Sequence, residues 1–298
     1  MSEPKKSLTT PPENLKEAID WVLRVSGRDG TLTDKTTELT NAISVRSTAT
    51  AYSNNFMSEV NDMSSFISRV AAVLQSFIGY EYSGRKEDNY NFRINGNGII
   101  KLGIIIAKRQ SQSTNNNVYT SAYRSTSWDF AVGNSNDAKI KAVQCFYIAI
   151  EKIFEGLTKL YLKCKKGWSS YRLDGNTDLQ NFMKQNGFGK TQLNPSMTAD
   201  KIASEVLKGF KEFSTAYNSA GDNPSLDAFR SQLEQNAMSS PSNYPLTALY
   251  ILATYVYVQS TSPATPSFLG YSGTAALAGG AYGFNLGGIG TFMSALLA

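Results

Sequence analysis

The chain has 298 residues, of which 41% are hydrophobic and 11% aromatic, and its net charge of +5 is only mildly basic. A chain of this length forms one or two domains, and this composition excludes a disordered protein. It contains no histidine, which excludes Ser-His-Asp and Cys-His catalysis and histidine-ligated zinc. Catalysis by carboxylates, lysine or a bound cofactor stays open.

The N-terminal part predicts an arm followed by two helices. Residues 1–13 are polar with three prolines and predict a flexible arm. Asn14 is the expected N-cap of a helix that ends near Gly27 and Gly30, and a second helix is expected over 32–46. The apolar face of the first helix carries Leu15, Ala18, Ile19, Val22 and Leu23. Its acidic neighbours Glu17, Asp20 and Asp29 are expected on a solvated face.

A third helix is expected over 56–79, where apolar residues recur at steps of three and four. Residues 80–97 are polar and turn-rich. The apolar run 98–107 is a buried strand or a helix segment, and periodicity does not decide between them. Residues 110–136 predict a long polar loop. It is either an adaptable contact surface or a poorly ordered insertion.

The longest predicted helix covers 137–166. Cys145 and Cys164 would lie about 28 Å apart on it, too far for a disulfide, so we expect two small buried residues. Lys163, Lys165 and Lys166 come directly before Gly167, where cations stabilise a helix C-terminus. We therefore expect no nucleic-acid partner.

Four shorter helices are expected over 177–186, 198–217, 224–238 and 245–258. The last of them is apolar on nearly all sides and is expected to be deeply buried. Gly187 begins a GFGKT sequence, but a phosphate loop needs a glycine where Lys184 stands. Gly187 and Gly189 are better interpreted as a helix stop.

The C-terminal part carries no Asp, Glu, Lys or Arg after Glu234, so its last 64 residues (298 − 234) lack these charges. Small residues recur there every four positions, as in double GxxxG patterns that let two backbones approach closely. Either a helix-packing or partner face or a glycine-rich irregular segment fits this pattern. The residues of the face are Ala275, Gly279, Gly283, Gly287, Thr291 and Ala295.

Neither a secretory signal peptide nor an apolar run long enough for a transmembrane helix is visible. Calcium-loop and dinucleotide fingerprints are also absent. We expect no catalytic, cofactor-binding or metal-binding residue and no cofactor, so the chain is predicted not to be an enzyme.

Three stretches resemble the variant erythrocyte surface antigen family of Babesia. They are PPENLKEAIDWVLRVSGRDG (11–30), LTALYILATYVYVQS (246–260) and TPSFLGYSGTAALAGGAYGFNLGGIGTFMSALLA (265–298). The resemblance implies export to the infected erythrocyte surface or membrane, antigenic variation and cytoadhesion. The partners that it implies are a host endothelial receptor or a second antigen subunit, and membrane association stays open.

The chain departs from that family pattern in three respects. It is much shorter, it has two cysteines where a cysteine- and lysine-rich region is expected, and it shows no clear anchor. A short paralogue, a truncated gene and the N-terminal portion of a longer product are the alternatives. The competing hypothesis is an intracellular, non-enzymatic helical interaction protein.

The predicted fold is mainly α. It is a multi-helix, bundle-like domain over 14–260 with the long polar loop. A glycine-rich apolar segment over 261–298 is expected to pack on the domain or on a partner. Insertion of residues 271–298 into a membrane is a narrower hypothesis.

Overall fold

The computed structural model describes most of the helical part of the chain, and the predicted mainly α fold is confirmed. The described residues are 6–29, 34–44, 63–78, 80–81, 93–94, 121–123, 127–166, 177–188 and 198–261. The small-residue face, the apolar run 98–107 and residues 56–62 lie outside them. Two short strands, β1 (Tyr80–Glu81) and β2 (Arg93–Ile94), pair antiparallel.

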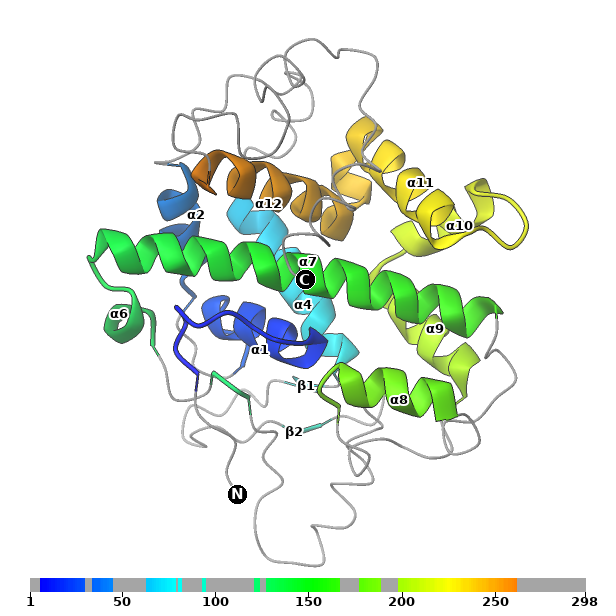
Figure 1. Ribbon diagram of the computed structural model, residues 1–298, viewed down its shortest axis with the longest axis horizontal. Coiled ribbons are helices and arrows are strands. Elements are labelled where there is room, and N and C mark those ends of the chain that lie inside the picture. The colour runs from blue at the N-terminus through cyan, green and yellow to red at the C-terminus, as the bar shows by residue number, and fades with distance from the viewer. Residues whose placement is uncertain are drawn as a thin grey trace, which may run out of the picture.

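Figure 1 labels the helices in the order in which they follow one another along the chain. They are α1 (Leu15–Val25), α2 (Thr36–Ser44), α4 (Met63–Phe77), α6 (Trp128–Ala131), α7 (Asn136–Lys166), α8 (Thr177–Gln185), α9 (Ala199–Gly209), α10 (Glu212–Ser219), α11 (Leu226–Ser239), the 3-10 turn η4 (Pro241–Asn243) and α12 (Pro245–Thr261).

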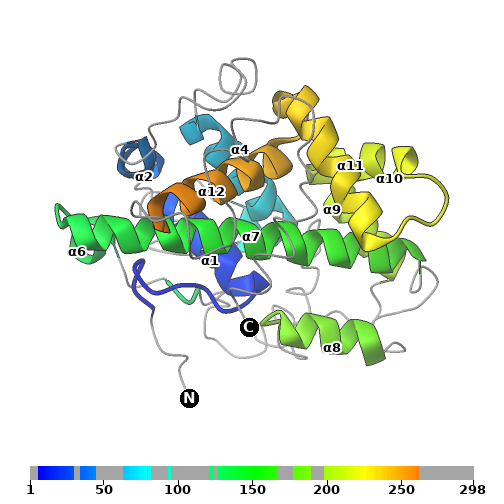
Figure 2. The ribbon, with the colours of Figure 1, turned by 45° about the horizontal axis from the view of Figure 1, so that its top comes forward.

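Helix α7 is the element on which the others pack. It has 31 residues, so it is about 45 Å long at 1.5 Å per residue. Helices α1, α9 and α12 make its most extensive contacts. Figure 1 shows α1 and α8 on one side of α7 and α12 on the other, and in Figure 2 α8 and α12 again lie on opposite sides of α7. The predicted longest helix is thereby confirmed. Cys145 and Cys164 are free and buried in it, as expected.

Helices α1 and α7 approach closely at Gly156. A Cβ atom built on Gly156 would lie 3.0 Å from Cδ2 of Leu15 and 3.1 Å from Cδ1. Leu15 is 1% exposed, so its side chain has little free space to move into. A mid-helix glycine costs about 1 kcal/mol relative to alanine, and the close approach of α1 explains why one stands here.

The predicted flexible arm is wrong over residues 6–13. Leu8 is 1% exposed, and its carbonyl accepts a hydrogen bond of 3.1 Å from the indole Nε1 of Trp21. Lys6 N donates to the carbonyl of Ala122. Polar composition suggested an arm, but one leucine and backbone hydrogen bonds hold this segment against α1.

The predicted polar loop over 110–136 is also wrong in part. Its described residues 127–131 include α6, which Ser127 caps by accepting a hydrogen bond from Phe130 N. Tyr123 is fully buried at 0% exposure, and its hydroxyl donates to the carbonyl of Thr10 over 3.0 Å. Tyr123 therefore anchors this segment to the N-terminal residues.

The single helix expected over 198–217 is two helices, α9 and α10. The break follows Gly209, a residue with low helix propensity, and leaves Phe210 between them at 1% exposure. Phe210 and Phe213 make an edge-to-face contact at 6.0 Å. Because the chain changes direction after Gly209, both rings are buried. A continuous helix would lack this change of direction.

Helix α12 is enclosed as its apolar composition predicts. All described side chains from Leu246 to Thr254 are buried, and the ring of Tyr250 stacks on Phe154 of α7 at 4.2 Å. None of the described helices combines the length and the apolar composition that a membrane-spanning helix needs.

We expect the effect of Gly156→Ala to change sign with the residue at position 15. In the wild-type background, crowding of Leu15 should outweigh the helix preference of alanine and lower the free energy of unfolding by about 1 kcal/mol. In a Leu15→Ala background the added methyl group enters the space left by the leucine and should raise that free energy by about 1 kcal/mol. Urea denaturation of the four proteins measures both effects. A stabilising Gly156→Ala in the wild-type background would contradict close packing at this point.

Candidate functional site

A polar groove lies where α7, α8 and the start of α1 meet. Its volume is about 700 Å³. Three lysines of α7 line one wall: Lys152, Lys159 and Lys163. The other groups are Glu13, Asn14, Leu15, Glu155, Gly156, Asp178, Asn181, Phe182, Gln185 and Asn186. The lining carries both signs of charge and many amides, which suits a polar segment of a partner better than an apolar small molecule.

The groove is built on a junction between the first turn of α1 and the end of α8. Asn14 caps α1 by accepting a hydrogen bond of 3.0 Å from Glu17 N. Lys16 N, another donor of the first turn, reaches the carbonyl of Asn186 over 3.1 Å. The N-terminus of α1 thus meets the C-terminal end of α8. Backbone N–H groups that α1 cannot pair within itself lie near carbonyl groups that α8 cannot pair, so a hydrogen bond forms between the two ends.

Gly187 makes this junction sterically feasible. It ends α8 with φ +84°, a conformation that L side chains rarely adopt. A Cβ at this position would also overlap the Asn14 side chain and lie 3.0 Å from Cβ of Lys16. The predicted helix stop at Gly187 is confirmed, and the phosphate-loop alternative has no support there. Gly189 lies outside the described residues.

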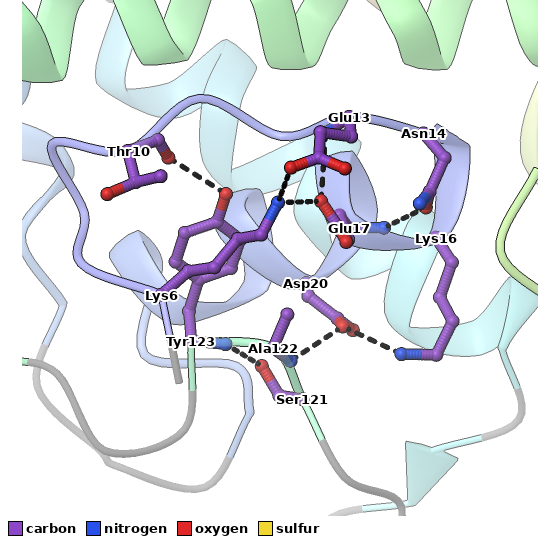
Figure 3. A network of polar contacts seen from close by, with 10 residues as sticks. All are labelled: Lys6, Thr10, Glu13, Asn14, Lys16, Glu17, Asp20, Ser121, Ala122 and Tyr123. Atoms are coloured by element: carbon purple, nitrogen blue, oxygen red, sulfur yellow. Dashed lines mark hydrogen bonds and ion pairs between the residues drawn. The ribbon is translucent and has the colours of Figure 1, made fainter. Parts of the chain in front are cut away.

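A salt-bridged network covers the N-terminal side of α1, as Figure 3 shows. Lys6 Nζ lies 2.7 Å from Glu13 Oε1 and 2.7 Å from Glu17 Oε2, and Glu13 N donates to the same Glu17 oxygen. Burial acts to lower the pKa of Lys6, but its hydrogen bonds to the two carboxylates raise it above the usual value. The hydrogen bond from Lys6 lowers the pKa of Glu13.

Asp20 lies on the same helix but in the protein interior. Its side chain is 0% exposed, and Oδ2 lies 3.1 Å from Lys16 Nζ. The same oxygen accepts a hydrogen bond of 3.0 Å from Ala122 N. Figure 3 shows Asp20 between Lys16 and the 121–123 segment. It therefore ties α1 to a residue about a hundred positions further along the chain.

The expectation of a solvated acidic face on α1 is wrong. Asp29 is 9% exposed and lies 2.6 Å from Arg24 Nε, while the Glu17 side chain is only 18% exposed. Buried charges persist in folded proteins when they are paired and hydrogen-bonded. Lys16, Asp20 and Arg24 stand four residues apart, and this alternation of sign is the signal in the sequence that could have indicated paired charges.

A second polar cluster lies behind the groove and shares Glu155 with it. Glu155 Oε2 lies 3.2 Å from Lys159, and Oε1 lies 2.5 Å from a guanidinium nitrogen of Arg230 in α11. Arg230 also reaches the hydroxyl of Tyr250 over 3.4 Å. Glu155 therefore connects the exposed lysines of the groove with the buried interface of α7, α11 and α12.

The described residues hold no group of three or more His, Cys, Asp or Glu side chains that could bind a metal ion. Burial raises the pKa of both Cys145 and Cys164 to about 12, which makes these thiols poor nucleophiles. The groove presents lysines, carboxylates and amides along its walls. The sequence did not identify it, although the spacing of its lysines by seven and four residues places them on one helix face.

Comparisons of the chain with protein-family models, with curated proteins and with solved structures find no match. The resemblance noted in the sequence consequently gains no support from them.

We expect Gly187→Ala to destabilise the protein more than Gly221→Ala. Both glycines have positive φ, +84° and +87°, but a Cβ at Gly221 meets nothing within 4 Å. Each substitution should cost about 1 kcal/mol for the backbone conformation, and Gly187→Ala should cost about 1–3 kcal/mol more through overlap with Asn14. Thermal and urea unfolding measure the difference. Equal losses would contradict a close junction between α8 and α1.

Proposed function

We propose that this chain is a helical antigen module of the variant erythrocyte surface antigen type of Babesia, which acts by binding and not by catalysis. The observation that carries the proposal is the resemblance of residues 11–30, 246–260 and 265–298 to that family. By the same resemblance, it would be displayed on the infected erythrocyte and contribute to cytoadhesion and antigenic variation.

Two of the resembling stretches form scaffold elements. Residues 11–30 include α1 with its cap and buried ion pairs, and residues 246–260 form most of α12. Both helices pack on α7. These stretches resemble the family in residues that form the protein interior. Core residues are determined mainly by packing, whereas binding residues lie mostly on the surface. The resemblance therefore supports a common helical scaffold.

The first contact surface that we propose is built on this scaffold, because Glu13, Asn14 and Leu15 line the polar groove. The polar groove between α7 and α8 offers exposed lysines and amides to a protein partner, either a host endothelial receptor or a second antigen subunit. The small-residue face from Ala275 to Ala295 is proposed as a second contact, in a glycine-rich segment over 261–298 that packs on the helical domain, on a partner subunit or in a membrane.

Protease treatment of intact infected erythrocytes tests the display of this chain. Lys163, Lys165 and Lys201 are exposed in the structure, so trypsin should cut a chain that it can reach. We expect the full-length band, detected with an antibody against residues 137–166, to disappear without lysis. Haemoglobin retained within the cells serves as the control for intact membranes.

A band that survives until the cells are lysed would contradict surface display. That result would favour the competing hypothesis, an intracellular helical interaction protein with a partner inside the erythrocyte or the parasite.

A further inference from the structure

Three buried glutamates lie where the α10–α11 hairpin (residues 212–239) contacts the rest of the protein. Glu212 begins α10 and is 2% exposed, Glu234 of α11 is 5% exposed, and Glu151 of α7 is 6% exposed. Carboxylates are rarely buried to this extent without a paired cation. Arg230 of α11 acts on both Glu151 and Glu234, whereas Glu212 lies near Leu246 and Thr247 of α12.

Among the described residues, the ion pairs that the cations of this interface form are with Glu155 and not with the buried Glu151 or Glu234. Arg230 of α11 forms an ion pair of 2.5 Å with Glu155. Glu234 and Glu151 interact with the charge of the same guanidinium, which Glu155 already partly neutralises. Lys159 also pairs with Glu155 and is 45% exposed, so solvent screens its charge. Lys152 is the further charged side chain on α7 that acts on Glu151. Oε2 of Glu151 has no hydrogen-bond partner among the described residues.

Glu212 lies against α12 instead of α7, and its carboxyl group is also buried. Its carboxyl lies near the N–H groups of Leu246 and Thr247 in the first turn of α12, and Arg69 of α4 acts on it from further away. Neither of its oxygens forms a hydrogen bond of good geometry with a described group. The two N–H groups and Arg69 favour the ionised carboxylate, but burial of Glu212 opposes it more strongly.

Apolar contacts hold the hairpin in place against this cost. The rings of Phe213 and Phe229 lie 5.5 Å and 5.7 Å from that of Tyr161 on α7. Figure 1 shows α10 and α11 together at one end of the molecule. Docking therefore combines favourable burial of aromatic rings with burial of three carboxyl groups, whose cost depends on whether they carry a charge.

We propose that protons control the docking of the α10–α11 hairpin onto α7 and α12. The hairpin is firmly docked when Glu151, Glu212 and Glu234 are protonated, and ionisation of these groups loosens it.

The direction of the pH dependence follows from the pKa of each group. Burial raises the pKa of Glu151 to about 7, with a further contribution from Glu155. Burial also raises the pKa of Glu234 to about 7 against the opposing charge of Arg230, and that of Glu212 to about 8. The docked state thus binds more protons than an open state in which these groups have their ordinary pKa of about 4.5. Docking is strongest below about pH 4.5 and weakens as the pH rises to 7–8.

Hydrogen–deuterium exchange of the full chain, followed by mass spectrometry at pH 5.5 and pH 8.0, tests the proposal. After correction for intrinsic exchange rates, we expect protection of peptides from 212–239 to fall at least about tenfold at the higher pH, since each bound proton contributes a factor of ten per pH unit. Peptides from α1 should change much less. The overturning results are equal protection of the hairpin at both pH values, or an equal loss in α1 and the hairpin.

Glutamine variants separate charge from packing. Glu151→Gln and Glu234→Gln keep the shape of the protonated side chain, so each should reduce the pH dependence of hairpin exchange. Asp227→Asn on the exposed face of α11 is the matched control and should leave that pH dependence unchanged. Unaltered pH dependence in both glutamine variants would overturn the assignment. If a variant does not fold, carbon-13 NMR titration of the wild-type glutamate carboxyls gives the decision, and three ordinary pKa values would overturn the proposal.

Discussion

The close packing of α1 on α7 is the constraint on which the rest of the described structure depends. Leu15 meets α7 where Gly156 leaves room for it, and nearly every residue of α1 is buried as a result. A helix buried on all sides cannot leave its polar groups to water. Residues 6–13, the 121–123 segment and the end of α8 therefore close around α1 and provide the hydrogen bonds that solvent would otherwise supply.

This enclosure also determines which polar side chains of the described helices remain exposed to solvent. The ion pairs Lys16–Asp20 and Arg24–Asp29 and the described apolar side chains of α12 are buried, whereas Lys159 and Lys163 of α7 remain exposed to solvent. Glu155 stands between these regions because it contacts both Lys159 in the groove and Arg230 at the buried interface. The groove and the interface of the α10–α11 hairpin are thus physically connected through one carboxylate.

The sequence predicted the helices well because their signals are local. Asn14 is the N-cap of α1 as expected, and the apolar periodicity of α7 predicted both its length and its burial. The sequence-based predictions were wrong where contacts between residues far apart in the chain determine the structure. Leu8 alone does not indicate that residues 6–13 are ordered, and Asp20 appears solvated until Ala122 is known to lie beside it. The groove was missed for the same reason, since its walls come from three separate segments. The small-residue face from Ala275 to Ala295 stays a prediction.

Removal of residues 1–13 tests the enclosure of α1 most directly. The truncated chain loses the buried Leu8 side chain and leaves the indole N–H of Trp21 and the hydroxyl of Tyr123 without their present acceptors. We expect the free energy of unfolding, measured by urea denaturation, to fall by about 3 kcal/mol or more. An unchanged denaturation midpoint would mean that this segment is a flexible arm after all, and would contradict the enclosed α1.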